Sequence, residues 1–328
     1  MIKRRDFITL LGGAATAWPL AARAQQLALP VIGLVNAASP DVSARYRAAF
    51  RAGLNESGLV EGQNVMVEDH WLDGKYDQLS SLMSDLVRRR VALIAAPGST
   101  LSALAAKAAT RTIPIVFGVG DDPVKEGLVA SLARPDGNAT GVNFFLTEVV
   151  GKRLGLLHEI VPKSVRVAVL NNPANTANEP MLRDISEAAR ALGMQAQVFN
   201  ASTGPEIEAA FAGIARERAD ALFAVPDGLF NGRRVQLAIL AVRYGIPSAY
   251  SNRDIVEAGG LMSYGTDIAE MFRQVGVYAG RIFKGAKPAD LPVIQSTKFE
   301  LAINLQAARA LGLSVSADVV SIADTVIE

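Results

Sequence analysis

Small polar side chains follow most of the short apolar segments of this 328-residue chain. They occur in six loops, which comprise residues 36–39, 97–100, 120–123, 171–175, 226–228 and 250–252. Where apolar segments form an open parallel sheet, ligands bind beyond the carboxyl ends of the strands. Hydroxyl, amide and carboxylate groups at those ends can satisfy the hydrogen bonds of a small polar molecule. The six loops therefore predict a binding cleft that is rich in donors and acceptors.

Aspartates are the charged candidates in these loops. Asp121, Asp122 and Asp227 follow predicted strands, and Asp267 follows a later one. In a desolvated cleft, an aspartate can pair with the ammonium group of a ligand. An aspartate before a helix can equally cap its first turn, and the sequence leaves both roles open.

The segment 97–100 reads Pro-Gly-Ser-Thr and opens a predicted helix. The free N–H groups and the positive dipole end of a helix can receive a carboxylate or a phosphate, so Ser99 and Thr100 are candidate binding residues. An ordinary helix cap is the alternative. The spacing of Gly and Lys fits neither a P-loop nor a dinucleotide fingerprint.

Residues for other chemistries are scarce. The chain has no Cys and two His, His70 and His158, which share no metal-ligand spacing, so we expect no metal, no cofactor and no enzymatic activity. We expect both histidines to be structural. Phe144, Tyr250 and Tyr264 could stack on a ligand, although burial in the core explains aromatic residues near strand ends as well.

The elements that must position these loops form two series. The first predicts strands at 31–35, 65–71, 92–96 and 114–119, alternating with helices at 43–57, 76–89 and 100–110. The second predicts helices at 148–161, 179–192, 206–217 and 231–244, alternating with strands at 166–170, 195–199, 220–225 and 247–250. Alternation of this kind indicates an α/β fold with parallel sheets and helices on both faces. We therefore expect two Rossmann-like lobes joined by a hinge.

Three later elements complete the chain: a segment at 260–265, a helix at 267–283 and a strand at 297–303. We expect them to return first to one lobe and then to the other. No flexible linker separates the two series, which favours several direct chain crossings and a hinge.

The N-terminal residues are typical of an export signal. Arg4 and Arg5 precede a weakly apolar run of 16 residues, 7–22, and Ala22-Arg23-Ala24 provides a signal-peptidase pattern. A membrane-spanning helix needs roughly 20 apolar residues, so a retained anchor is the weaker alternative. We predict a twin-arginine signal peptide at 1–24 and a periplasmic mature protein.

The net charge argues against nucleic acid or an anionic membrane as a partner. The predicted signal removes four basic and one acidic residue from totals of 33 and 32, leaving a net charge of about −2. We therefore expect no binding to nucleic acid.

Five short motifs occur in an order that resembles a known family. They are Val31-Ile32-Gly33, residues 120–124 (Gly-Asp-Asp-Pro-Val), 138–141 (Asn-Ala-Thr-Gly), 169–173 (Val-Leu-Asn-Asn-Pro) and 264–267 (Tyr-Gly-Thr-Asp). Over residues 30–328 the chain resembles the ABC transporter substrate-binding proteins whose better-known members bind tryptophan or tyrosine.

The resemblance implies the type I periplasmic-binding-protein fold, with chain crossings near 143–144, 262–263 and 297–298. One lobe would then comprise 30–143 plus 264–297, and the other 144–263 plus 298–328. The family's cleft maps onto Ser39, Ser99, Thr100, Asp122, Asn172, Asn178, Asp227 and Tyr250. Because the family often has Gly-Asp-Pro where this chain has Gly-Asp-Asp-Pro, Asp121 and Asp122 are both candidates for the residue facing the ligand.

The functional hypothesis is a monomeric, non-enzymatic solute-binding protein of an ABC importer. It would capture a small zwitterionic or anionic ligand, such as an aromatic amino acid, by hinge closure and deliver it to an inner-membrane permease. Two alternatives remain: a periplasmic ligand sensor for a membrane receptor, and an exported aspartate-dependent hydrolase.

Overall fold

The computed structural model describes residues 29–40, 44–145, 149–296 and 298–328. The predicted signal peptide and Thr297, at the third predicted crossing, lie outside the described residues. Within the described ranges, no helix combines the length and the apolar character needed to cross a membrane.

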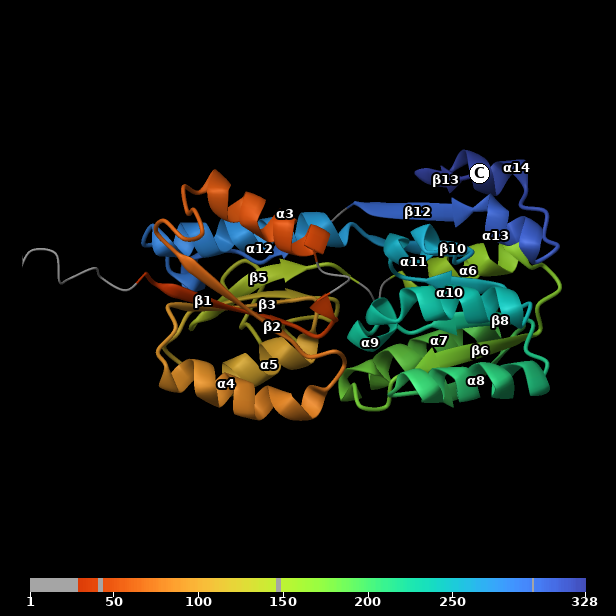
Figure 1. Cartoon of the computed structure of the whole chain (residues 1–328), viewed down its shortest axis with the longest axis horizontal. Coiled ribbons are helices and arrows are strands. Elements are labelled where there is room, and N and C mark those ends of the chain that lie inside the picture. The colour runs from red at the N-terminus through yellow and green to blue at the C-terminus, as the bar shows by residue number, and fades with distance from the viewer. Residues whose placement is uncertain (1–28, 41–43, 146–148, 297) are drawn as a thin grey trace, which may run out of the picture.

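Two separate sheets divide the chain into two lobes (Figure 1). The sheet of the first lobe has the order β11-β5-β4-β3-β1-β2, and all its pairs are parallel. Its strands are β1 (Val31–Asn36), β2 (Met66–Trp71), β3 (Leu93–Pro97), β4 (Ile115–Val119), β5 (Ala139–Asn143) and β11 (Ile294–Gln295).

The sheet of the second lobe has the order β13-β12-β10-β9-β8-β6-β7. Its pairs are parallel except β10 with β12. Its strands are β6 (Arg166–Asn171), β7 (Gln195–Asn200), β8 (Ala221–Ala224), β9 (Ser248–Tyr250), β10 (Met262–Thr266), β12 (Phe299–Asn304) and β13 (Thr325–Ile327).

The first five strands of each lobe follow the same spatial order. β2-β1-β3-β4-β5 in the first lobe corresponds to β7-β6-β8-β9-β10 in the second. This order reverses direction between β1 and β3, and again between β6 and β8. Such reversals leave a crevice beyond the carboxyl ends of the strands, so each lobe presents one natural binding edge.

Helices cover both faces of each sheet. In the first lobe, α3 (Ala44–Glu56) and α12 (Ile268–Phe283) lie on one face, and α4 (Leu79–Arg88) and α5 (Thr100–Ala109) on the other (Figure 1). In the second lobe, α6 (Val150–Ile160), α7 (Glu179–Ala191), α13 (Leu305–Ala310) and α14 (Ala317–Ser321) share a core on one face. The opposite core contains residues of α8 (Gly204–Arg216), α9 (Gly228–Gly232), α10 (Arg234–Arg243) and α11 (Arg253–Glu257). Short 3₁₀ turns occur at η2 (Tyr76–Gln78), η3 (Thr176–Asn178) and η4 (Pro288–Asp290).

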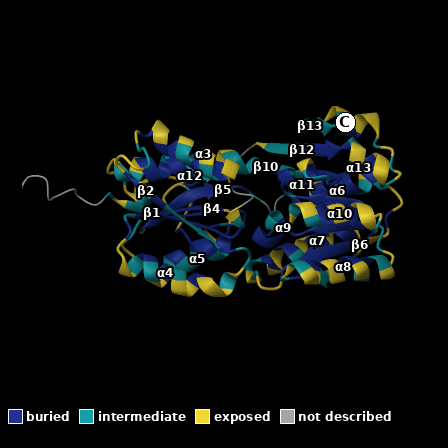
Figure 2. Cartoon of the chain, viewed as in Figure 1, coloured by how far each residue is buried: buried dark blue, intermediate teal, exposed yellow. Residues whose placement is uncertain are grey.

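Side-chain alternation explains the two cores of each lobe. Leu93 and Ala95 of β3 face the core under α3 and α12, whereas Ile94 and Ala96 face α4 and α5. Successive strand residues point to opposite faces, so a sheet covered on both sides needs continuous apolar segments. Figure 2 shows the result, with buried strands at the centre of each lobe and exposed residues on the outer helix faces.

The predicted α/β class with two predominantly parallel sheets is confirmed, with one local difference in the chain crossings. The expected division placed 264–266 in the first lobe, but Tyr264 to Thr266 pair with β12 in the second sheet. The chain enters the first lobe at α12, which packs on α3, and returns to the second at β12. The sequence did not predict the pairing of β10 with β12, because the two strands are distant in the chain and a local residue pattern does not report which strands pair.

The predicted helix at 231–244 is instead two helices, α9 and α10, which meet at Arg233. Strand β5 was not predicted, because Thr140, Gly141 and Asn143 weaken its apolar pattern. Gly141 is required there, since a Cβ atom would lie 2.0 Å from the carbonyl oxygen of Phe117.

Glycines bring α12 close to α3. A Cβ atom on Gly276 would lie 2.2 Å from the Phe50 carbonyl oxygen, and one on Gly53 would lie 1.9 Å from that of Arg273. Backbone atoms cannot move aside as a side chain can, so this helix pair depends on residues without side chains.

We predict that Gly276→Ala lowers the free energy of unfolding by about 1–3 kcal/mol, because the added methyl group forces α3 and α12 apart. Gly155→Ala in α6 is the control, since a Cβ there meets no atom within 4 Å. That change should raise stability by up to about 1 kcal/mol through helix propensity. Urea unfolding measures both, and equal effects of the two substitutions would contradict the close packing.

Candidate functional site

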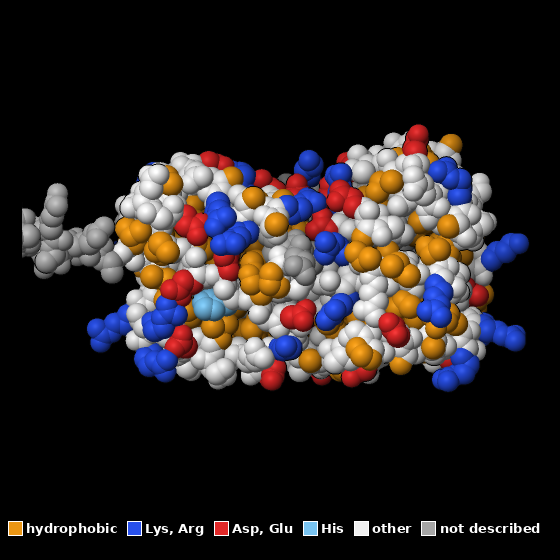
Figure 3. Space-filling view, in the orientation of Figure 1, with side chains coloured by type: hydrophobic (Ala, Val, Ile, Leu, Met, Phe, Trp, Pro, Cys, Tyr) orange, Lys and Arg blue, Asp and Glu red, His pale blue; other side chains and the backbone are white. Residues whose placement is uncertain are grey.

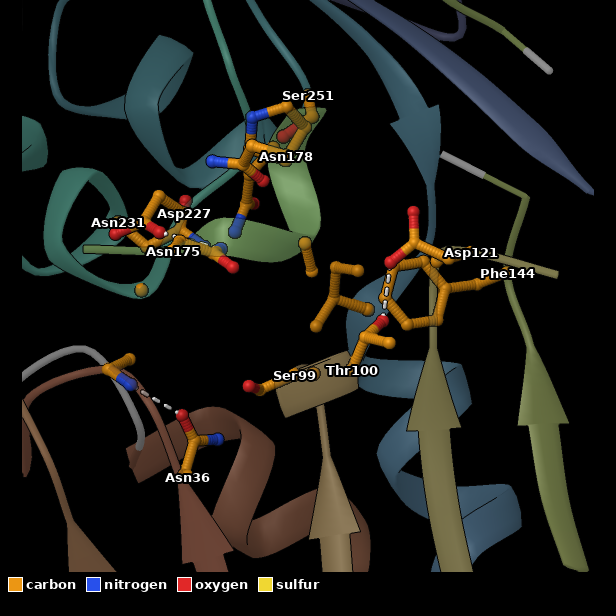
Figure 4. A pocket seen from close by; sticks show the side chains of 18 of the residues that line it. Asn36, Ser99, Thr100, Asp121, Phe144, Asn175, Asn178, Asp227, Asn231 and Ser251 are labelled. Atoms are coloured by element: carbon orange, nitrogen blue, oxygen red, sulfur yellow. Dashed lines mark hydrogen bonds between the residues drawn. The ribbon is translucent and has the colours of Figure 1, made fainter. Parts of the chain in front are cut away.

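A cavity of about 80 Å³ lies between the two lobes, where the binding edges of the two sheets face each other (Figure 4). The first lobe contributes Asn36, Ala38, Tyr46, Tyr76, Gly98, Ser99, Thr100, Gly120, Asp121, Phe144, Ile268 and Phe272. The second lobe contributes Asn175, Ala177, Asn178, Met181, Pro226, Asp227, Gly228, Asn231, Ser251 and Asn252. Most of these residues directly follow a strand, as the position of a switch point requires.

Local hydrogen bonds fix the loops of the first lobe. The Asn36 side chain accepts a bond of 2.7 Å from the backbone N–H of Ala38. The Ser99 hydroxyl caps α5 by accepting a bond of 3.2 Å from the N–H of Ser102. The capped N-terminal end of α5 therefore borders the cavity, and its dipole favours negative charge there.

Asp121 lines the first-lobe side of the cavity. The Thr100 hydroxyl donates a hydrogen bond of 2.5 Å to Oδ2 of Asp121. Burial raises the pKa of the Asp121 carboxyl above its ordinary value, and the bond from Thr100 opposes that rise. No basic side chain forms an ion pair with Asp121 in the part of the chain that the structure describes. This carboxylate is therefore only partly compensated.

Asp227 lines the opposite side and is compensated by four donors. Its side chain accepts bonds from Asn172 Nδ2 at 3.0 Å, from Asn175 Nδ2 at 2.9 Å and from the Leu229 N–H at 2.9 Å. The fourth donor is the hydroxyl of Tyr76 in the first lobe, at 3.0 Å. Burial raises the pKa of the Asp227 carboxyl, and the hydrogen bonds act in the opposite direction.

A second polar cluster joins the lobes through α3 and α11. The Tyr46 hydroxyl donates to Asp254 at 2.5 Å and accepts from Asn252 Nδ2 at 2.9 Å. Arg45 forms an ion pair of 2.6 Å with the same aspartate. Tyr46 also stacks on Phe272, with 5.2 Å between the ring centroids. Both lobes thus meet through hydrogen bonds at residues that line the cavity.

The charge of the cavity is negative. Among the described residues that line it, Asp121 and Asp227 are the charged ones, and Lys, Arg and His do not contribute. The described ranges hold no group of His, Cys, Asp and Glu that could bind a metal ion. Such a lining suits a neutral or zwitterionic molecule with an ammonium group better than a net anion.

Five of the predicted site residues line the cavity: Ser99, Thr100, Asp121, Asn178 and Asp227. The other four lie outside its lining. Asn172 is buried behind Asp227 and holds it in place. Ser39 lies against Gly232 of the opposite lobe.

Asp122 and Tyr250 have local roles. Asp122 accepts bonds from the N–H groups of Val124 and Lys125, so it caps a turn while Asp121 lines the cavity. Tyr250 is fully buried in the second lobe, and burial raises its pKa to about 12. The further candidate Asp267 caps α12 through the Glu270 N–H.

Strand-end reasoning missed the lining residues carried by helices. Tyr46 lies on α3, Tyr76 begins η2, and Ile268 and Phe272 lie on α12. A residue on a helix reaches the cleft only because of how the helix packs in the folded protein. The rule that ligands bind at strand ends therefore does not predict it. Four further lining residues were within the six predicted loops but were not singled out as binding residues, because their neighbours are polar as well. They are Asn36, Asn175, Ser251 and Asn252.

Comparison with known proteins identifies related chains. The family model described as ABC transporter substrate binding protein matches residues 31–327. A tyrosine-binding protein of Clostridioides difficile (strain R20291) is 27% identical over 275 residues, which cover 84% of this chain and 79% of that protein.

Two solved structures share the fold. One is a conserved domain protein of Vibrio cholerae, with a TM-score of 0.83 and 24% identity, over 90% of this chain and 99% of that one. The other is an ABC domain of Streptococcus pneumoniae in complex with L-Trp, with a TM-score of 0.81 and 23% identity, over 92% and 100%. The expected two-lobed type I periplasmic-binding-protein fold is confirmed.

We predict that Tyr76→Phe shifts the lobes toward an open arrangement by roughly tenfold or more, because a hydrogen bond to a charged group contributes about 1.5–3 kcal/mol. The chain has no Cys, so fluorophores attached through Ala52→Cys and Ala212→Cys can report the distance between the lobes.

Tyr278→Phe is the matched control, since its hydroxyl donates to the Pro292 carbonyl within the first lobe. It should leave the distance distribution unchanged. An unchanged distribution in Tyr76→Phe would show that its bond to Asp227 does not hold the lobes together.

Proposed function

Because the chain belongs to the ABC transporter substrate-binding protein family, we propose that it captures a small zwitterionic ligand outside the cytoplasm for import. The protein would hold its ligand between the lobes and deliver it to the membrane permease of an ABC importer. The predicted export signal supports a periplasmic location. The cavity, lined from both lobes by hydrogen-bonding groups, supports the capture role.

The observation that carries the ligand assignment is the partly compensated carboxylate of Asp121. It lines the cavity with one hydroxyl donor, and burial raises its pKa, so a ligand ammonium group would compensate its charge. The N-terminal end of α5 beside it provides a place for a ligand carboxylate. Together they favour an α-amino acid over the net anion that the sequence also allowed.

Apolar side chains favour an aromatic or aliphatic substituent on this ligand. Phe144, Ile268 and Phe272 line the cavity on the first-lobe side, and Met181 lines it on the second. The relatives whose names record tyrosine binding and a complex with L-Trp support an aromatic amino acid. We propose L-tyrosine and L-tryptophan as the first molecules to examine.

Closure would follow from contacts to both lobes. A ligand in this cavity touches groups of each lobe, so it binds the closed arrangement more tightly than the open one. The ligand then shifts the population toward closure by that difference in affinity.

The alternatives receive less support. Asp227 accepts four hydrogen bonds, which leaves it poorly placed to act as a base or a nucleophile in a hydrolase. An aspartate-dependent hydrolase would therefore have to use Asp121 alone, and turnover that Asp121→Asn abolishes would support it. A broad basic surface would favour binding to nucleic acid. The face shown in Figure 3 instead has interspersed acidic and basic side chains. A sensor would use the same ligand site, and measurement of uptake in cells separates sensing from transport.

We predict that L-tyrosine or L-tryptophan raises the thermal stability of the purified protein. A ligand at 100 times its Kd adds about 2.7 kcal/mol to the free energy of unfolding, which is readily seen as a higher Tm. Glutarate, a small dianion without an ammonium group, is the control for a net anion. Stabilisation by glutarate but by no amino acid would contradict the assignment.

We predict that Asp121→Asn weakens binding of the stabilising amino acid roughly 10- to 100-fold, because it removes the charge facing the ammonium group. Asp122→Asn, at the neighbouring residue outside the cavity lining, should leave the affinity within about twofold. Calorimetric titration measures both, and equal losses would exclude a specific role for Asp121.

The pH dependence follows from the same group. The carboxyl of Asp121 must be ionised to attract ammonium, and its pKa is raised by burial. Affinity should therefore be full above that raised pKa and fall as the pH decreases through it, at a higher pH than for an exposed aspartate. Asp121→Asn should remove this dependence.

A further inference from the structure

Arg153 on α6 is a fully buried cation in the second lobe. It is 0% exposed, and among the residues that the structure describes no other Lys or Arg side chain is buried. Lys and Arg side chains are almost never buried completely unless a partner compensates their charge. The surroundings of Arg153 therefore show which partner this position needs.

Two contacts hold the guanidinium group in place. Its Nε donates a hydrogen bond of 2.7 Å to the carbonyl oxygen of Tyr264 on β10, and its central carbon lies 5.2 Å from the ring centroid of Phe223 on β8. Nη1 and Nη2 are buried as well, and no group in the described ranges accepts a hydrogen bond from either. A guanidinium group has five N–H donors, so four of them lack an acceptor.

The charge of Arg153 also lacks a counter-charge. Burial lowers the pKa of its guanidinium group to about 9, so the group is still a cation at neutral pH, and no carboxylate among the described residues acts on that pKa. Moving an unpaired ion from water into a protein interior is strongly unfavourable. The four free donors and the positive charge therefore call for the same kind of partner, which is an anion.

The N-terminal end of α6 adds positive potential beside this group. The N–H of Arg153 donates to the carbonyl oxygen of Val149, which precedes the helix, so Arg153 lies in the first turn. Side chains on a helix lean toward its N-terminus. Val149 has no polar side chain to cap the helix, and the free N–H groups and dipole of a helix N-terminus attract negative charge.

We propose that Nη1 and Nη2 of Arg153, at the N-terminal end of α6, bind a small monovalent inorganic anion such as chloride. The occupant is distinct from the molecule that the cavity takes, because Arg153 is not among the residues that line the cavity and its Nη atoms are buried. It is monovalent because a single positive charge is to be balanced, and a dianion would leave a negative charge buried instead. Tyr264 lies just before the crossing into α12, and α6 follows the crossing from β5, so the anion would stabilise two elements that border the hinge.

Urea unfolding of the purified protein in sodium chloride and in sodium gluconate tests the proposal. The two salts screen charges equally at equal ionic strength, but gluconate is too bulky to enter a buried site. Above the Kd of the anion, each tenfold rise in chloride should lower the unfolding equilibrium constant about tenfold relative to gluconate, which is the signature of one site in the folded state.

Two substitutions locate the effect. Arg153→Met keeps much of the length of the side chain without its charge, and it should abolish the difference between chloride and gluconate. Arg190→Met, at an exposed arginine of α7, is the matched control and should retain that difference. Crystals of the unchanged protein grown in sodium bromide give a measurement that does not depend on the folding of a variant. The anomalous signal of bromine should lie within hydrogen-bonding distance of Nη1 or Nη2 of Arg153.

Several outcomes overturn the proposal. They are equal stability in the two salts, a chloride effect that persists in Arg153→Met, a water molecule instead of bromide at Arg153, and a bromine signal without any effect in solution, which would mean an adventitious ion only. Glu148 lies outside the described residues, and a chloride effect that appears only in Glu148→Gln would identify that carboxylate as the partner instead. None of these measurements needs the cargo molecule, so their result is independent of the amino-acid titrations.

Discussion

A buried carboxylate without a cationic partner constrains the arrangement of the whole cleft. Asp227 is 5% exposed, and the transfer of such a charge from water costs several kcal/mol unless hydrogen bonds replace its hydration. Asn172, Asn175 and the Leu229 N–H provide three of them from the second lobe. These bonds tie the loop after β6 to the loop after β8. The fourth comes from Tyr76, so full compensation of this charge requires the lobes to be together.

Asp121 differs from Asp227 in how far it is compensated, and this difference assigns their roles. One hydroxyl, that of Thr100, donates to Asp121, whereas four donors surround Asp227. A further donor at Asp227 would have to displace an existing one. At Asp121, a ligand donor would add to what is present. The cavity thus combines a carboxylate whose donors come from both lobes with one that can accept a further donor from a ligand.

The sequence predicted the architecture well, because each feature it depends on is local. Continuous apolar strands such as Leu93–Pro97 indicated sheets buried on both faces, and the strand-end rule led to Ser99, Thr100, Asp121 and Asp227. What the sequence could not provide was long-range pairing. The antiparallel pair β10–β12 moved a lobe boundary by three residues. The same limit applies to the site, since Tyr46 and Tyr76 reach the cleft through the packing of helices.

The proposed capture role requires closure to remain finely balanced, so that the protein can release the ligand it has bound. Two polar clusters join the lobes, Tyr76 with Asp227 and Tyr46 with Asp254. Because each exchanges bonds to protein for bonds to water when the lobes part, its net contribution is limited to a few kcal/mol, below the gross strength of the bonds. A ligand that contacts both lobes can then decide the equilibrium with a modest difference in affinity. Tyr76 lines the cavity, and its hydroxyl bonds to Asp227 across the boundary between the lobes. A single side chain therefore belongs both to the wall of the cavity and to the contact that joins the lobes, so a ligand that touches Tyr76 acts directly on that contact.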